Sequence, residues 1–420
     1  MRRGLRRREA LCCTGALAAG LFSSLLSGCE DDAGTAWLRN PCRSALPTDG
    51  ALRDLVRRAF DGIDATRLVD THAHLLGTGD SGSGCSVHPS MHQWWRPIEM
   101  LRRRMILDAG CVEADAASID RRYVQRLLEL SNAFPGGARC WLYAFAKAHD
   151  DEGRERDDWS TFHVPDAYAA SVAAAQRERF DWVASIHPYA ADALERLDWA
   201  KRRGAAAVKW LPSAMNIDLA SPRCGPFYEA LRGAGLPLIV HCGEEKAAPG
   251  AGREAFVNPL LVRHPLAAGV RVIVAHAASL GHAEDIDRPS RTRTSSFELF
   301  ARVMREQRGS PLLLADISAV FQRNRTADVW RAVLANEGWH ARLVNGSDYP
   351  LPGVMPLFAP RQLVAAGLLD AALVAPLLRL REHNALLFDF VLKRHLRLGS
   401  IVLPASVFEA RALANTNNNA

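Results

Sequence analysis

Five side chains that commonly bind metal ions follow short apolar runs at four widely separated places in the chain. His72 and His74 end the first run, His241 and His276 end two later runs, and Asp348 follows the fourth. A buried strand is typically a short, continuous apolar run. In closed parallel barrels, catalytic side chains lie where such strands end. We therefore predict a metal site assembled from distant parts of the chain.

The first pair has a spacing that suits ligation. On an extended strand, His72 and His74 leave on the same face while Ala73 points away. Imidazole binds zinc, iron, nickel and similar metals. An isolated pair of this kind is often accidental, and a single histidine at a strand end is often a structural hydrogen-bonding group. Asp348 could bind the metal and accept a proton from water, or it could simply cap an Asx-turn.

The segments that must position these side chains alternate between strand-like and helix-like patterns from Arg67 onward. Eight strands are expected, at Leu68–His72, Cys140–Ala146, Trp182–His187, Ala206–Leu211, Pro237–Cys242, Val270–His276, Leu312–Ile317 and Arg342–Ser347. Eight strands, each followed by a helix, predict an α/β fold of the (β/α)8 TIM-barrel type. A doubly wound open sheet is the alternative, although it requires neither eight strands nor ligands from both early and late strands.

A long insertion follows the first strand, over residues 75–139. It opens with a glycine- and serine-rich run and then carries His88, His92, Trp94 and Trp95. Loops at this end of a barrel shape substrate pockets. We expect Trp94 and Trp95 to form a pocket wall that contacts substrate, or alternatively to pack on the barrel. His187, at the end of the third strand, is also expected to contact substrate, whereas His88, His92 and His282 are expected to be structural.

Taken together, these residues resemble the metal-site signature of the amidohydrolase superfamily. The resemblance rests on His72-x-His74, Lys209, His241, His276 and Asp348, and it covers about residues 68–388. The nearer match is the branch of TIM-barrel metal-dependent hydrolases that also contains metal-dependent decarboxylases. It implies that His72, His74, His241 and Asp348 bind metal, and that Asp348 is the general base. It implies that His276 binds a second metal or polarises substrate.

Lys209 determines how many metals the resemblance implies. In some family members a lysine at this place is carboxylated and bridges two metals, and in others it binds a substrate anion or lies near a single metal. Carboxylation needs a neutral amine, which burial favours by lowering the pKa of lysine. In the third interpretation, Lys209 is merely packed, with its amine reaching toward solvent.

The charge of the chain is concentrated at its beginning. The 420 residues carry a net charge of +6, of which residues 1–28 supply +4. The remainder is close to neutral, so nothing indicates a nucleic-acid partner. Residues 1–28 are similar to a twin-arginine secretory signal, with an apolar run too short to span a membrane; Sec export is the other route. Residues 26–29 resemble a lipobox, which implies a lipid on Cys29.

These features divide the chain into a signal peptide (1–28), a tether and lead-in (29–62), the barrel (63–395) and a C-terminal tail (396–420). The expected location is extracytoplasmic, with the protein held to a membrane as a lipoprotein. Six cysteines follow Cys29, and no CxxC spacing occurs among them, so a cysteine zinc site is not expected. Cys85 and Cys111 are a candidate disulfide pair among fifteen possible full pairings.

The sequence thus predicts a metal-dependent hydrolase with a divalent metal, zinc in the first instance, at one or two per chain. Its substrate would be a small molecule with an amide, ester or lactone bond. Asp348 and His276 would be its catalytic residues. A non-oxidative decarboxylase on the same fold is one alternative, and a non-catalytic metal- or solute-binding lipoprotein is another. The oligomeric state is left open.

Overall fold

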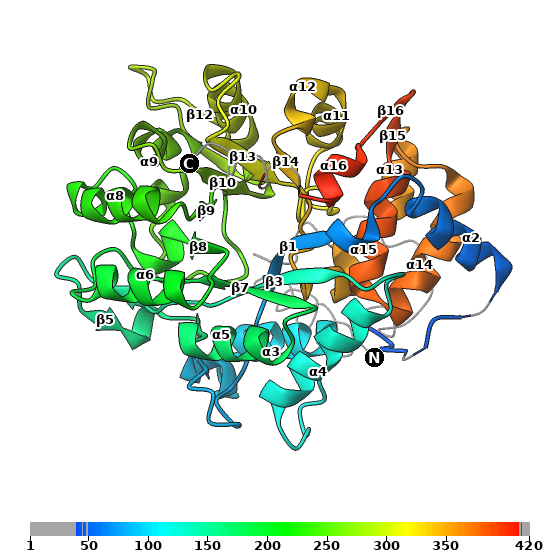
Figure 1. The fold of residues 1–420 in the computed structure, drawn as a ribbon, viewed down its shortest axis with the longest axis horizontal. Coiled ribbons are helices and arrows are strands. Elements are labelled where there is room, and N and C mark those ends of the chain that lie inside the picture. Colours follow the sequence, from blue (N-terminus) through cyan, green and yellow to red (C-terminus); the bar gives the residue numbers. More distant parts are fainter. Residues whose placement is uncertain (1–38, 44, 48, 411–412, 414–420) are drawn as a thin grey trace, which may run out of the picture.

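Eight parallel strands form the centre of the molecule (Figure 1). The structure is a computed structural model that describes residues 39–43, 45–47, 49–410 and 413. The strands are neighbours in the order in which they occur in the sequence: β1 (Val69–His74), β3 (Arg139–Tyr143), β7 (Phe180–Ala184), β8 (Ala207–Trp210), β9 (Leu238–His241), β10 (Val272–Ala275), β13 (Leu313–Asp316) and β14 (Leu343–Val344). Each coincides with one of the eight predicted segments.

The sheet closes on itself between its first and last strands. The backbone N–H of Thr71 donates to the carbonyl of Asn345 at 2.9 Å, and that of His74 donates to the carbonyl of Tyr349 at 2.8 Å. Ala73 and Tyr349 form a parallel bridge. The predicted (β/α)8 barrel is therefore confirmed, and the doubly wound open sheet is excluded.

Helices surround the strands (Figure 1). Those that follow barrel strands are α4 (Ile119–Asn132), α5 (Asp166–Ala175), α6 (Ala193–Arg202), α8 (Gly225–Ala234), α9 (Arg263–Ala267), α10 (Ser296–Glu306), α11 (Ala327–Ala335), α14 (Val374–His383) and α15 (Ala385–His395). Local chemistry sets several boundaries. The side chains of Ser118 and Asn384 accept backbone N–H bonds at the starts of α4 and α15. Gly235 ends α8 in the left-handed conformation, at φ 70°.

Alternate residues of the barrel strands point inward and fill the barrel. The inner layer consists of Tyr143, Val183, Ala207, Ile239, Ile273, Ala275, Leu314 and Val344. Because strand side chains alternate, the residue two positions beyond an inward residue also points inward. Lys209 follows Ala207, His241 follows Ile239, and Asp316 follows Leu314 in this way. The apolar layer therefore continues directly into the polar groups at the carboxyl ends of the strands.

The insertion after β1 contains β2 (Ser86–Val87), a 3₁₀ turn at Pro89–His92 and the helix α3 (Pro97–Ala109), and α4 completes it. A disulfide joins Cys42 to Cys111, with 5.5 Å between their Cα atoms. The expected Cys85–Cys111 pair is therefore wrong: Cys85 is a buried, free thiol. The partner comes instead from the lead-in segment, which crosses the end of α3 and places Cys42 beside Asp108.

Further elements precede and follow the barrel in the chain. Helix α2 (Gly50–Ala59) of the lead-in packs on α14 and α15. Beyond residue 395, where we expected a tail, β15 (Arg397–Leu398), β16 (Ile401–Val402) and α16 (Ala405–Phe408) follow, and Ala410 joins the inner layer. The predicted signal peptide and Cys29 lie outside the described residues. Within the described residues, no helix has both the length and the apolar character to cross a bilayer.

Candidate metal centre

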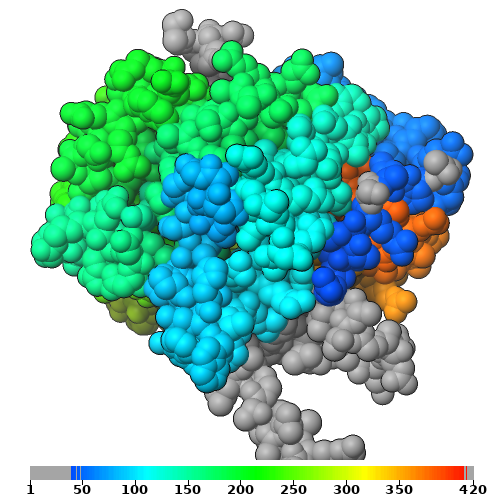
Figure 2. Space-filling model, turned by 90° about the horizontal axis from the view of Figure 1, so that it is seen from below, coloured from blue at the N-terminus to red at the C-terminus, as the bar shows by residue number. Residues whose placement is uncertain are grey.

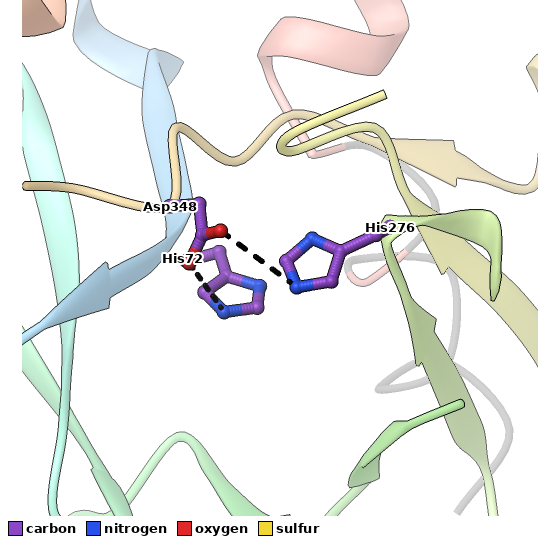
Figure 3. Close-up of side chains that lie close together, drawn as sticks. All are labelled: His72, His276 and Asp348. Carbon is purple, nitrogen blue, oxygen red and sulfur yellow. Dashed lines mark ion pairs between the residues drawn. The ribbon is translucent and has the colours of Figure 1, made fainter. Parts of the chain in front are cut away.

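Three buried side chains from different strands converge at the carboxyl end of the barrel (Figure 3). They are His72 of β1, His276 directly after β10, and Asp348 after β14. The Asp348 carboxylate lies 3.5 Å from Nε2 of His72 and 3.8 Å from Nε2 of His276. Ligand atoms of a tetrahedral site with bonds near 2.1 Å are about 3.4 Å apart. This group could therefore hold a metal ion.

His74 and His241 flank the group. Nε2 of His74 lies 3.1 Å from the Asp348 carboxylate. The ring of His241 lies 5.2 Å from that of His276, centroid to centroid. The three side chains whose ligand atoms lie close together thus include His276. For a single metal, the resemblance had instead implied His74 and His241 beside His72 and Asp348. All five predicted ligand side chains nevertheless lie within one cluster.

A buried carboxylate and a hydroxyl orient two of the imidazoles. Nδ1 of His72 lies 3.0 Å from the Asp316 carboxylate, to which its N–H donates. The Ser318 hydroxyl donates to Asp316 and accepts from Nδ1 of His276 at 2.7 Å. With both Nδ1 atoms donating, the lone pairs of Nε2 are directed toward Asp348. Carboxylate or carbonyl partners of this kind fix the tautomer of metal-binding histidines.

The site also contains nitrogen atoms that lack a partner. Nε2 of His72, Nε2 of His241 and Nζ of Lys209 are buried with no hydrogen-bond partner among the described residues. Such groups are costly to bury unless something else satisfies them. Burial lowers the pKa of His72, His241 and His276. Neutral imidazoles with a free lone pair are suitable metal ligands, so these residues fit a divalent cation.

Local backbone features place His72 and Asp348 next to each other. The Asp70 carboxylate accepts from the backbone N–H groups of His72 at 3.0 Å and Ser347 at 2.8 Å, which links β1 to the loop after β14. Burial raises the pKa of Asp70 to about 6. A Cβ atom on Gly346 would lie 2.5 Å from Cβ of His72, so this close approach requires glycine. Asp348 adopts a left-handed φ of 61°, a conformation that non-glycine residues often show at functional sites.

Lys209 lies at the edge of this group. Its side chain is 1% exposed, and Nζ lies 5.2 Å from the centre of the Tyr143 ring. Burial lowers the pKa of the amine, although the nearby carboxylates of Asp316 and Asp348 oppose this shift. The amine therefore does not reach solvent, and the snorkelling alternative for Lys209 does not fit the structure.

A cavity of about 160 Å³ opens onto the cluster. One wall is apolar and consists of Leu76, Ile106, Phe145, Phe162, Leu211, Leu280, Leu351 and Leu357. Charged side chains also line the cavity, among them Lys209, Glu244, Glu245 and Arg325. The Arg325 guanidinium bonds to Gln322 at 2.7 Å and Ser279 at 3.2 Å, and no carboxylate among the described residues pairs with it. A larger groove of about 1450 Å³ lies elsewhere and contains none of the candidate ligands.

Comparison with protein-family models shows the family of the chain. The model of a family described as Amidohydrolase matches residues 69–379. The chain belongs to this amidohydrolase family. The matched segment begins within β1 and includes all five clustered metal-ligand candidates, so the family assignment agrees with the resemblance drawn from the motifs. No match is found among curated proteins.

Several solved structures resemble this member of the amidohydrolase family at low identity. An uncharacterized TIM-barrel protein from Bordetella bronchiseptica is 18% identical, with 71% of this chain and 99% of that chain covered and a TM-score of 0.43. A putative amidohydrolase from Staphylococcus aureus is 11% identical (69% and 90% covered, TM-score 0.39). A 5-carboxyvanillate decarboxylase from Sphingomonas paucimobilis is 13% identical (72% and 96% covered, TM-score 0.37). Likenesses this distant do not indicate which reaction the chain catalyses.

Three residues predicted to contact substrate do not line the cavity. His187 is buried, where Nε2 donates to the Met215 carbonyl at 2.7 Å and Nδ1 accepts from the backbone of Tyr189. Trp94 and Trp95 are 79% and 59% exposed on the insertion, so they neither form a pocket wall nor pack on the barrel. The insertion still reaches the cavity, but it does so through Leu76 and through Ile106 of α3.

Four residues at or near this site were not identified from the sequence: Asp316, Ser318, Glu245 and Arg325. Asp316 had a signal, because it ends the seventh apolar run just as the candidate ligands end theirs. Glu245, 3.4 Å from Nδ1 of His241, and Arg325 lie in loops after strands, where no periodicity marks them. Only the folded barrel shows that these loops face the cluster.

Proposed function

We propose that the chain is a metal-dependent hydrolase that uses water to cleave an amide, ester or lactone bond of a small molecule. The observation that supports this most is the buried group of His72, His276 and Asp348, in which Nε2 of His72 has no hydrogen-bond partner in the described part of the chain and lies 3.5 Å from the Asp348 carboxylate. His72, His276 and Asp348 would hold a divalent metal, with His74 and His241 as further ligands. A bound metal would lower the pKa of water to about 7 and polarise the scissile bond.

The chain's own residues would carry the protons. Asp348 would accept a proton from the attacking water and later donate it to the leaving nitrogen or oxygen as the bond to carbon breaks. His74, 3.1 Å from this carboxylate, would hold it in position. By holding the metal beside the substrate, His276 would help to stabilise the negative charge that develops on the substrate oxygen. Zinc is the metal we propose, at one per chain, or at two if Lys209 is carboxylated.

Product analysis in isotopically labelled water tests this assignment. A hydrolase incorporates one labelled oxygen into the acid product, and Asp348→Asn should lower kcat by at least about 100-fold, the size of a typical general-base contribution. His88→Ala is the control, because His88 bonds to Ser90 in the insertion and lies outside the cluster. Turnover without label incorporation would contradict the proposal.

A decarboxylase is the second candidate, and the basic side chains that line the cavity favour it. Lys209 and Arg325 present cationic groups that no carboxylate among the described residues pairs with, which suits a substrate bearing a carboxylate. Release of carbon dioxide, with a solvent proton appearing on the carbon that lost it, would identify this reaction. The third candidate, a non-catalytic binding lipoprotein, predicts that Asp348→Asn leaves ligand affinity intact and that no substrate is turned over.

We also propose that the protein is extracytoplasmic and held to a membrane by a lipid on Cys29. The support is the sequence of residues 1–29, all of which lie outside the described residues. Radiolabelled palmitate incorporated by the full chain, and lost in Cys29→Ser, would support the anchor. A chain that remains unlabelled would contradict it.

A further inference from the structure

Exposed large hydrophobic side chains are concentrated in one short stretch of the insertion. Of the eight such side chains in the described part of the chain, five lie between residues 94 and 101. They are Trp94, Trp95, Ile98, Met100 and Leu101, and we call them the Trp94 patch. Clustered apolar groups on a surface mark an interaction site, whereas single ones do not.

The patch is flanked by positive charge. Arg96, Arg102, Arg103 and Arg104 lie within or next to it, against the single acid Glu99. Glu99 pairs with Arg102, and Asp108 lies 3.8 Å from Arg104, whereas Arg96 and Arg103 pair with no carboxylate among the described residues. Amphipathic helices with aromatic and aliphatic residues beside arginines lie on anionic lipid surfaces, and tryptophan prefers the headgroup level. The composition of this stretch therefore matches an anionic membrane surface better than a neutral one.

The position of the N-terminal segment supports the same partner. Arg39, the first described residue, pairs with Asp108 of α3 at 3.8 Å, and the Cys42–Cys111 disulfide fastens this segment to the end of that helix. Only nine residues lie between Cys29 and Arg39, a span of at most about 35 Å. Figure 2 shows the insertion (sky blue) standing out on the same face as the N-terminal segment (dark blue). A lipid on Cys29 would thus hold this face close to the bilayer.

We propose that the Trp94 patch rests on the anionic phospholipid surface to which the chain is anchored. The contact would fix the orientation of the barrel, which a lipid on a tether alone leaves free. Helix α3 carries part of the patch at its start and Ile106 of the cavity wall near its end. The helix is about 20 Å long, so Ile106 in the cavity lining would lie within that distance of the lipid surface.

Tryptophan quenching by brominated lipids tests the contact directly. The purified full chain is mixed with vesicles of brominated phosphatidylglycerol and phosphatidylcholine (1:2), or of brominated phosphatidylcholine alone. The chain has ten tryptophans, and quenching of the two patch tryptophans would remove roughly a fifth of the emission. We expect this loss in the anionic vesicles, with less in phosphatidylcholine alone and less in 0.5 M salt.

Two variants test whether the quenching comes from the Trp94 patch or from other tryptophans of the chain. Trp94→Gln/Trp95→Gln should abolish the difference between the two vesicle types without changing the melting temperature, because both side chains are exposed. Trp159→Gln is the matched control. It should keep the difference in quenching between the two vesicle types, since Trp159 packs under Arg156 outside the patch. Equal quenching of wild type and the double variant would overturn the proposal. So would conversion of a dimer to a monomer by the double variant with its quenching retained, which would assign the patch to a second copy of the chain.

Discussion

Replacing Asp316 with asparagine should weaken metal binding while leaving the fold intact. One oxygen of Asp316 accepts from the backbone N–H groups of His276 and Ser318, both at 3.0 Å, and the amide oxygen of asparagine can keep these bonds. The other oxygen, 3.0 Å from Nδ1 of His72, would be replaced by an amide N–H₂ group. Two donors would then face each other, so His72 would move its proton to Nε2 and lose the lone pair that binds metal.

The size of this effect follows from the single contact that changes. A hydrogen bond to a charged acceptor contributes about 1.5–3 kcal/mol. That range corresponds to a roughly 10- to 100-fold loss of metal affinity, which is also the usual effect of changing a residue that orients a metal-binding histidine. Competition with a chromophoric chelator would measure the dissociation constant for zinc in Asp316→Asn and in the wild type.

Asp166→Asn is the matched control for this experiment. Asp166 is also a buried carboxylate, but it bonds to the backbone of Ser185 and to Arg196, away from the cluster. It should leave metal affinity within about twofold of the wild type. An unchanged affinity in Asp316→Asn, or an equal loss in both variants, would refute the reasoning.

Four further predictions concern the ligands, the pH dependence and the scaffold. Elemental analysis should show that His72→Ala lowers bound metal, whereas His88→Ala leaves it unchanged; equal loss in both would mean that the insertion helps to build the site. Because burial holds the pKa of the imidazoles of His72, His241 and His276 below 6.5, the unfolded chain takes up protons that the folded chain does not. The free energy of unfolding of the metal-free protein should therefore fall as pH drops below about 6.5, by roughly 1 kcal/mol per pH unit for each imidazole that stays neutral, and a flat profile in urea titrations would contradict this. Cys42→Ser opens a loop with a sequence separation of 69 and should lower the free energy of unfolding by up to about 4 kcal/mol, a difference that reductant removes. Gly346→Ala should lower metal affinity by displacing His72, and wild-type affinity in that variant would argue against the close approach.

Much of the fold could be predicted because most barrel strands are short, largely apolar segments that alternate with helix-like stretches. The same segments placed the candidate ligands, since a residue that ends a parallel strand lies at one rim of the barrel. His72, His74, His241, His276 and Asp348 all followed from this rule.

The contacts between distant loops could not be predicted in this way. Cys42 meets Cys111 only because the lead-in segment crosses α3. Trp94 and Trp95 are exposed, whereas Ile106 of α3 lines the cavity. Nothing in the spacing of these residues distinguishes the alternatives. His187 illustrates the same limit: it ends a strand as the ligands do, yet the Met215 carbonyl occupies its ring nitrogen.

Anomalous diffraction at the zinc absorption edge, from crystals of the zinc-loaded protein, would test the metal centre most directly. The structure predicts an anomalous peak within about 2.0–2.2 Å of Nε2 of His72, Nε2 of His276 and a carboxylate oxygen of Asp348. Saturated crystals with no peak between these three side chains, or with the only peak at another place, would contradict the assignment of this cluster as the metal site.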